Sequence, residues 1–169
     1  MTNGDYDKVA THWTSKETDV VRMPEAELRA EVDAFLSSHN TCTLVCGAGD
    51  FVRCTPLEYV WRDGSFWIFS EGGLKFCALK WNKNVSLAVF EPYGGFGKLA
   101  SAQVTGTAEL IDPESDEFAE AVAAKGLPVS ALPKLRGMLH LIRVTPSRID
   151  YLCSEFKSRG FDSRQWIEL

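Results

Sequence analysis

The chain has 169 residues, of which 45% are hydrophobic and 24% are charged, a composition typical of one globular domain with a hydrophobic core. Its net charge of -5 and its pI near 5.2 argue against a protein that binds nucleic acid through bulk positive charge. No uncharged run approaches the roughly 18 residues that span a bilayer, and residues 1–19 lack the apolar core of a signal peptide. We therefore expect a soluble cytoplasmic protein that binds neither nucleic acid nor membrane.

The cysteines and histidines indicate neither a disulfide framework nor a metal site. Cysteine occurs five times, an odd number, and no two cysteines form a C-x-x-C pair. His12, His39 and His140 are scattered and follow no ligand spacing. We expect reduced cysteines, buried as small hydrophobic residues, and no catalytic metal.

The first forty residues predict a polar arm followed by one helix. Residues 1–22 are polar and mixed, which indicates an irregular arm or a short helix. Residues 24–40 predict a helix, because Pro24 suits a first turn and apolar residues recur at helical spacing. These apolar residues are Leu28, Val32, Phe35 and Leu36.

Most of the remaining chain predicts strands. Residues 41–62 contain two strands separated by the turn GAGD, and Asp63-Gly64 ends the second. Four further runs alternate or are rich in aromatic and β-branched residues, and they are residues 65–70, 84–90, 101–112 and 140–152. Within the third of these runs, Gly106 indicates a bulge or a close backbone approach.

Two helices are expected between the last two strands. The first starts at Asp112 and Pro113 and ends at Gly126. Its apolar face contains Phe118, Ala121 and Val122. The second is a short helix within residues 130–138.

A short helix is also expected after residues 70–73, which read SEGG. Leu74, Cys77, Ala78 and Trp81 fall at i, i+3, i+4 and i+7, and this spacing predicts one apolar face. Lys75, Lys80 and Lys83 lie outside that face. A lysine in the first turn opposes the helix dipole, so the position of Lys75 indicates an anion placed between the two.

These elements predict a small barrel. Tight turns between the first strands imply antiparallel pairing. Six strands in one domain favour closure, because a closed sheet has no exposed edges. The fold class is therefore mainly β with flanking helices, built on a six-stranded antiparallel barrel. Side chains fill a barrel of this size, so a ligand must bind on its outer surface or at a subunit contact.

The order of several short motifs resembles that of the pyridoxamine 5'-phosphate oxidase-like FMN-binding split barrels. The resemblance covers about residues 28–149. It consists of R-x-x-P, D-G, an aromatic strand that ends in serine, G-x-K, N-x-x-V and V-x-G-x-A, in that order. It implies a split barrel, a homodimer, and FMN bound in the groove between the two barrels.

The same resemblance implies contacts to the polar end of FMN. Lys75 matches the lysine that contacts the FMN phosphate, and Arg53 matches a basic residue on the second strand that also faces this end. Phe69 and Ser70 match the strand end that meets the ribityl phosphate, and Leu74 belongs to the G-x-K motif and is included in the site. Arg53, Ser70 and Lys75 converge if the second and third strands pair, which suits a phosphate dianion.

Contacts to the rest of the flavin come from three further segments. Thr55 and Pro56 match the segment that runs under the isoalloxazine ring. Ser101 or Gln103 contacts the flavin from the long strand, and both stay open because a one-residue slip exchanges the two faces of a strand. Trp166 is a candidate wall of the site in the partner subunit, with a tail packed on its own barrel as the alternative.

The domain boundaries follow from these matches. Residues 1–22 form an arm, residues 23–152 the split-barrel domain, and residues 153–169 a tail on the barrel or on the partner. The tail and the segment 112–126 lack the basic and substrate-binding residues of the true oxidase, so oxidation of pyridoxamine phosphate is not expected.

Three functions remain open. The first is an FMN-dependent oxidoreductase that acts on a small molecule with a nicotinamide or other reductant. The second is a non-catalytic FMN-binding module. The third is a haem-binding split barrel, which needs an axial ligand from a histidine, a cysteine or a tyrosine, and the three histidines lie outside the set of motifs. Against all three, Lys75 can be a solvated surface lysine and Arg53 a member of a surface ion pair.

Overall fold

A computed structural model describes residues 2–12 and 14–169. Within these residues one antiparallel sheet contains eight strands: β1 (Thr41–Ala48), β2 (Phe51–Glu58), β3 (Val60–Arg62), β4 (Ser65–Ser70), β5 (Asn84–Phe90), β6 (Ala100–Ile111), β7 (His140–Cys153) and β8 (Arg164–Glu168). The α-helices are α1 (Asn3–Ala10), α2 (Glu25–Ser38), α3 (Lys75–Leu79), α4 (Asp116–Ala124) and α5 (Leu132–Met138). Short 3-10 helices are η1 (Thr14–Asp19), η2 (Phe96–Lys98), η3 (Val129–Ala131) and η4 (Ser154–Arg159).

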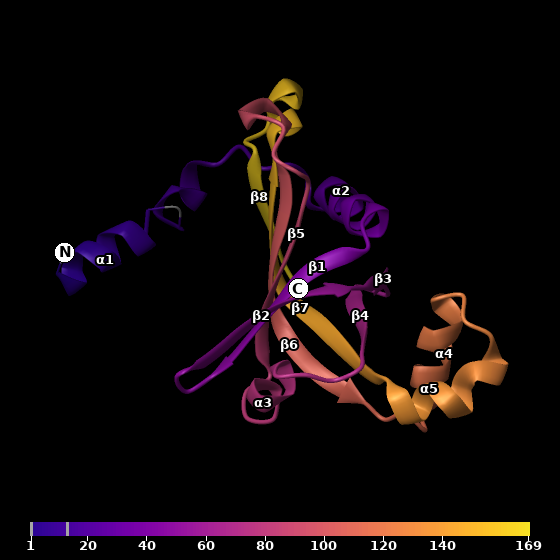
Figure 1. The fold of residues 1–169 in the computed structure, drawn as a ribbon. Helices are drawn as coiled ribbons and strands as arrows, with labels where there is room; N and C mark the ends of the chain where they lie inside the picture. Colours follow the sequence, from indigo (N-terminus) through magenta and orange to yellow (C-terminus); the bar gives the residue numbers. More distant parts are fainter. Residues whose placement is uncertain (1, 13) are drawn as a thin grey trace.

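The strands form a split barrel, and the predicted fold class is confirmed. The strand order is β2-β1-β5-β6-β7-β4-β3, with β8 paired to β7. The long strands β6 and β7 run through the centre of the sheet, while the β1–β2 hairpin extends to one side (Figure 1). The structure has two strands more than predicted. The second predicted strand is interrupted at Tyr59, whose N–H donates to the Asn40 carbonyl oxygen (2.8 Å), and the tail adds β8.

Helix α2 packs on the sheet through the apolar face that its sequence predicted. Its four predicted apolar residues are all buried: Leu28, Val32, Phe35 and Leu36. They pack against inward-facing residues of the strands, such as Leu44 on β1 and Phe66 on β4. The Tyr59 hydroxyl donates a hydrogen bond to the Leu36 carbonyl oxygen (2.8 Å) and so joins the interrupted strand to the helix.

The bulge predicted at Gly106 is confirmed. The register between β6 and β7 shifts between Thr105 and Gly106. A Cβ atom at Gly106 would lie 2.4 Å from the Thr145 carbonyl oxygen and 3.0 Å from Pro146 Cα. Only glycine allows the two backbones to come this close, and this steric requirement explains why a glycine stands inside the strand pattern.

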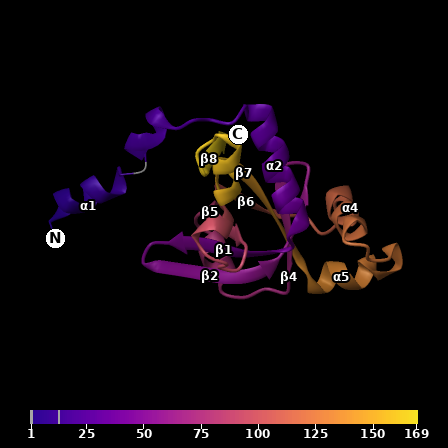
Figure 2. The ribbon, with the colours of Figure 1, turned by 90° about the horizontal axis from the view of Figure 1, so that it is seen from above.

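Helices α4 and α5 pack on the barrel beside β4 and β7, and on the side away from the N-terminal arm (Figures 1 and 2). The predicted residues Phe118, Ala121 and Val122 are buried there against Trp67 and Leu141. The first helix starts later than predicted, because the Ser115 hydroxyl accepts a hydrogen bond from the Phe118 N–H and caps it.

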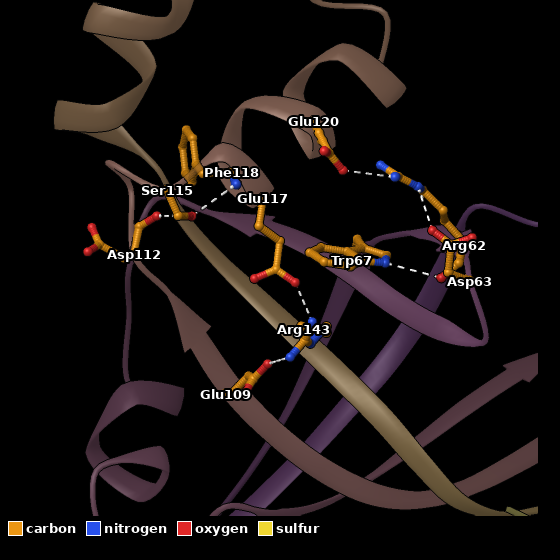
Figure 3. Close-up of polar contacts among 10 residues, drawn as sticks. All are labelled: Arg62, Asp63, Trp67, Glu109, Asp112, Ser115, Glu117, Phe118, Glu120 and Arg143. Carbon is orange, nitrogen blue, oxygen red and sulfur yellow. Dashed lines mark hydrogen bonds and ion pairs between the residues drawn. The ribbon is translucent and has the colours of Figure 1, made fainter.

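Arg143 ties α4 to the strands beneath it. Its guanidinium forms ion pairs with Glu109 on β6 and Glu117 on α4, and it lies 5.5 Å from the ring of Trp67 (Figure 3). A second arginine, Arg62, pairs with Glu120 of the same helix (3.1 Å). Carboxylates of α4 therefore face arginines of the sheet around the apolar contact.

The apolar face predicted for α3 is wrong. Ala78 is buried, but Leu74, Cys77 and Trp81 are exposed, with 76% of Trp81 accessible. Lys75, which the prediction left outside the apolar face, is only 4% exposed. With Leu74, Cys77 and Trp81 turned outward, the helix packs through Ala78, Leu79 and the stem of Lys75, since an aliphatic lysine stem can cover apolar surface.

The tail and the arm are linked to each other. The side chain of Gln165 on β8 is fully buried, and it accepts from the Met23 N–H (3.1 Å) and donates to the Val21 carbonyl oxygen (3.1 Å). Arg22 lies 3.7 Å over the ring of Trp166. The arm prediction covers residues 1–22, of which residues 1 and 13 lie outside the described residues. The described part contains α1 and η1.

The prediction of buried cysteines is only partly right. Cys42, Cys46 and Cys153 are buried and face the core, whereas Cys54 and Cys77 are exposed. The described residues contain no group of three or more His, Cys, Asp or Glu side chains placed to hold a metal ion. Among the helices that the structure describes, none is long and apolar enough to cross a membrane.

Candidate functional site

The loop before α3 brings together two of the predicted phosphate contacts. The Ser70 hydroxyl and the Lys75 ammonium both donate to the Gly72 carbonyl oxygen, at 3.1 and 2.5 Å, and the Gly72 N–H donates back to Ser70 Oγ (3.1 Å). Gly72 and Gly73 have φ angles of +128° and +105°, which residues with a Cβ rarely adopt. The two glycines therefore allow the loop to turn its carbonyl toward Lys75.

Arg53 reaches the same place from β2. It is the Cα partner of Cys46 on β1, so the two side chains lie on the same face. The buried Cys46 thiol donates weak hydrogen bonds to the Arg53 carbonyl oxygen (3.9 Å) and the Lys75 carbonyl oxygen (3.6 Å). The Cys46 thiol therefore contacts the backbone of both residues and connects β2 to α3, and the Arg53 charge is close enough to Lys75 to lower the pKa of its ammonium.

The two cations are not compensated by acidic groups. Within residues 2–12 and 14–169, no carboxylate lies within ion-pair distance of Lys75 or Arg53. Glu71, the nearest acidic residue in the sequence, is exposed and forms no ion pair with Lys75. Neither alternative reading of these residues fits: Lys75 is not a solvated surface lysine, and Arg53 is not in an ion pair.

Burial lowers the pKa of Lys75, because desolvation disfavours the charged ammonium. The neighbouring Cys46 acts in the opposite direction and raises this pKa, and the positive charge of Arg53 lowers it further. Burial also raises the pKa of Cys46, which favours a neutral thiol. An anion placed between Lys75 and Arg53 would favour the charged ammonium again.

The arrangement is suited to bind an anion. The Lys75 ammonium has three donors and uses one on Gly72, and the five guanidinium donors of Arg53 have no protein acceptor among the described residues. Ser70 contributes less than predicted, since its hydroxyl both accepts from and donates to Gly72. We call Arg53, Ser70 and Lys75 the cationic site.

The remaining residues predicted on the same chain segments point in different directions. Thr55 lies on the Arg53 face of β2 and is half-buried, whereas Pro56 lies on the opposite, outer face and is exposed. The Phe69 side chain turns away from Ser70 and packs edge-on against Phe118 (5.8 Å). Leu74 is exposed beside the loop of the cationic site.

A second group of predicted residues lies on the outer face of the sheet. Ser101 and Gln103 alternate with the buried Ala102 and Val104, so both point outward. Residues two apart on a strand share a face, so the prediction did not need to choose between Ser101 and Gln103. They line a small hollow of about 20 Å³ with Asp150, Leu152 and Arg164.

Trp166 lies on the same outer face, opposite Asp150 in the β7–β8 pairing. It lines a larger groove of about 720 Å³ between the arm, η2 and the β7–β8 pair. Leu152 and Arg164 line both the small hollow and this groove, which makes them neighbours. Within one chain the predicted site residues therefore fall into two groups, the cationic site and this outer face.

Sequence reasoning missed two contributors to the cationic site. Cys46 was read only as a buried hydrophobic residue, although the alternation of Cys42, Leu44 and Cys46 on β1 already placed it on the inner face. The Gly72 carbonyl was missed because a backbone acceptor has no sequence signature beyond the glycine pair that shapes its loop.

The sequence profile of the family described as pyridoxamine 5'-phosphate oxidase matches residues 28–153, about three quarters of the chain. The chain belongs to this family. No curated protein matches the chain. The match includes the whole sheet except β8, and both groups of predicted residues other than Trp166 lie within it.

Solved structures of similar fold include members with different described ligands. A FAD-binding protein from Mesorhizobium loti has a TM-score of 0.57 and 20% identity, and the alignment covers 72% of this chain and 89% of that chain. A heme binding protein from Mycobacterium smegmatis has a TM-score of 0.59 and 22% identity, covering 79% and 55%. ChuZ from Campylobacter jejuni has a TM-score of 0.66 and 16% identity, covering 99% and 69%. At these identities the similarity shows the fold, a pyridoxamine 5'-phosphate oxidase-like split barrel.

Proposed function

We propose that the protein binds FMN, with the flavin phosphate at the cationic site. The observation that carries the proposal is the pair Lys75 and Arg53, two neighbouring cations without a carboxylate partner among the described residues. Bringing two like charges together costs free energy unless an anion lies between them. A phosphate dianion with several acceptor oxygens matches the donors that remain on both side chains.

A second copy of the chain would complete the binding site for the isoalloxazine ring. Ser101, Gln103 and Trp166 lie on the outer face of the sheet, which also carries the exposed apolar residues Val52 and Phe90. The barrel interior is filled by the core, so a flavin needs an outer surface. We propose a homodimer in which the cationic site of one chain faces the outer face of its partner.

When bound, a flavin exchanges hydride or single electrons, and the protein supplies position and electrostatics. We propose an FMN-dependent oxidoreductase that acts on a small molecule and differs from pyridoxamine phosphate oxidase, since α4 carries acidic residues where the oxidase has its substrate-binding pair. NADH-driven turnover of an artificial electron acceptor separates this function from a non-catalytic FMN-binding module.

The phosphate contact is tested by comparing FMN with riboflavin, which has no phosphate. Lys75→Ala removes a charge-assisted contact of about 1.5–3 kcal/mol, so FMN affinity falls about tenfold to a hundredfold while riboflavin affinity stays the same. Flavin fluorescence quenching measures both. Lys134→Ala, on the exposed surface of α5, is the matched control. Equal losses for the two ligands would place Lys75 away from the phosphate.

The shared site is tested by mixing two defective variants. Lys75→Ala and Trp166→Ala each weaken FMN binding when measured alone. In a mixed dimer, one site combines the intact Lys75 of one chain with the intact Trp166 of the other, so tight FMN binding returns after subunit exchange. No recovery, or a monomer with FMN bound in light scattering, would contradict a site shared between two chains.

Haem is the alternative ligand, supported by the fold neighbour described as heme-binding. His39 is an unfavourable axial ligand, because Nδ1 contacts the Phe35 carbonyl oxygen (2.7 Å) and Nε2 contacts Glu91 (3.1 Å). The absorbance spectrum of the purified protein distinguishes the two, since a flavin and a haem absorb at different wavelengths. A Soret band in place of flavin bands would overturn the FMN proposal.

A further inference from the structure

A cavity of about 280 Å³ is lined by residues of α3 and of the strands β6 and β7. Its walls are mainly apolar and include Phe76 and Leu79 of α3, Leu110 of β6 and Ile142 of β7. Lys80 and Lys83 also line it. We call it the α3 cavity. None of the residues predicted for the flavin site lines it.

The α3 cavity is next to the cationic site. Phe76, which lines the cavity, follows Lys75 directly, and Lys75 Nζ lies 5.1 Å from the Phe76 ring centroid. The Phe76 ring also contacts the ring of His140 (5.2 Å between centroids), the strand partner of Ser70. One aromatic side chain therefore separates the two sites, so one extended ligand can reach both.

The rim of the cavity carries positive charge. No carboxylate of the described residues lies within ion-pair distance of Lys80 or Lys83. The Lys83 ammonium donates to the Leu79 carbonyl oxygen (2.5 Å), which holds it at the rim, and two of its three donors remain. Glu109 also lines the cavity, but its carboxylate is engaged by Arg143. With Lys75 and Arg53, four cations surround α3 in a protein of net charge -5.

We propose that the α3 cavity binds the heteroaromatic base of an adenine nucleotide, with its phosphate groups between Lys80, Lys83 and the cationic site. An apolar cavity lined by an aromatic ring accepts a planar base, and the lysines at its rim match the phosphates attached to it. The adenine nucleotide is either the AMP half of FAD or a separate dinucleotide. This inference rests on the proposed function only for the first of these sources.

The test uses the full chain and titrates ADP, FMN and FAD by calorimetry. Leu110→Trp fills the cavity from its mouth, where Leu110 is 55% exposed, and Lys83→Glu reverses one charge of the rim. Each substitution is expected to weaken ADP binding by about tenfold or more while FMN affinity stays within about twofold of the original value. Lys134→Glu is the control for a change of net charge.

Competition separates the two sources. If the base belongs to FAD, then FAD binds more tightly than FMN, and ADP displaces FMN because both need the cationic site. If the base belongs to a separate dinucleotide, its phosphates bind Lys80 and Lys83 alone and leave the cationic site to FMN, so ADP and FMN bind together. Both results support the proposal that the α3 cavity binds an adenine base.

Two results would overturn it: ADP binding that is unchanged in both variants, or no ADP binding together with equal affinities for FMN and FAD. If ADP binds and responds to the variants while FMN does not bind, the cavity assignment stands and the proposed flavin function fails.

Discussion

Two arginine-containing regions of the molecule differ in what surrounds their positive charge. Arg148 on β7 is held by three carboxylates, with distances of 2.7 Å to Glu17, 2.7 Å to Asp150 and 2.8 Å to Glu168. The hydrogen bond to Asp150 first, and then the contacts with Glu17, raise the pKa of Arg148. Arg53 has no such partner among the described residues, and it lies beside a second cation, Lys75, whose pKa is lowered by burial.

The comparison separates a structural role from a binding role. Arg148 connects η1 of the arm to β7 and β8, so its charge is used to hold three segments together. In the cationic site, the Ser70 hydroxyl and one ammonium donor of Lys75 hold the loop before α3, and the other donors of Lys75 and those of Arg53 are left for a ligand. The cationic site differs from an exposed single lysine such as Lys134, because Lys75 is buried and has a second cation, Arg53, close by.

The largest effect is expected from Arg53→Glu, which gives the cationic site a carboxylate of its own. FMN affinity falls by about a hundredfold or more, because a contact of about 1.5–3 kcal/mol is lost and the new carboxylate repels the phosphate. Fluorescence quenching measures the affinity, and Lys134→Glu controls for net charge. In the ligand-free variant a carboxylate replaces the like charge beside Lys75, so the melting temperature does not fall. Unchanged FMN binding would remove Arg53 from the site.

The converse substitution, Arg148→Met, removes the cation from the three-carboxylate cluster. The free energy of unfolding falls by about 1–2 kcal/mol, because Glu17, Asp150 and Glu168 lose their shared partner and repel one another. Urea denaturation measures this change, and limited proteolysis reports whether residues 14–22 become accessible. A variant with unchanged stability and an uncleaved arm would show that the cluster does not hold these segments together.

The smallest effect is expected from Lys75→Met in the ligand-free protein. Because the pKa of Lys75 is lowered in the folded state, the unfolded chain binds more protons between this pKa and the ordinary value of 10.5. The free energy of unfolding of the wild type therefore increases as pH rises through that interval. Below the interval, the buried ammonium is charged and its full cost to stability is present. Methionine removes the buried charge, so stability at neutral pH rises by up to about 1 kcal/mol.

Thermal melts at pH 7 and pH 10 measure this difference. The variant Lys75→Met melts at a higher temperature than the wild type at pH 7, and this difference is smaller at pH 10. Adding FMN to the wild type at pH 7 removes the difference. Lys134→Met, which changes an exposed lysine, is expected to shift neither value. A gain that is independent of pH would mean that the ammonium is not what costs stability.

Local sequence patterns determined much of the fold. The burial of Leu28, Val32, Phe35 and Leu36 followed from a period of 3.6 residues, and the bulge at Gly106 followed from a glycine inside a strand pattern. Both signals lie within a dozen neighbouring residues, so no knowledge of the remaining chain is needed to read them. The family resemblance rested on the same kind of short, ordered signals and was confirmed by the profile match.

The faces of α3 were decided by tertiary structure. The spacing of Leu74, Cys77 and Trp81 predicted a buried stripe, yet these residues are exposed and Lys75 is buried. Periodicity shows that a helix has two different faces but not which surface each face meets. An apolar helix face at a subunit contact or ligand site is exposed in the single chain until the partner or ligand covers it. No local sequence pattern distinguishes such a face from one that is buried in the core.

The candidate site shows the same division. The sequence determined which residues carry suitable chemistry: a lysine after two glycines, an arginine on a strand, and polar residues on a long strand. Only the tertiary structure decided that the charges of Arg53 and Lys75 lie close enough to interact, while Ser101, Gln103 and Trp166 lie together on the outer face. The reason is that strand register and sheet curvature are set by packing across the whole barrel, and a one-residue shift would exchange the faces on which these residues lie.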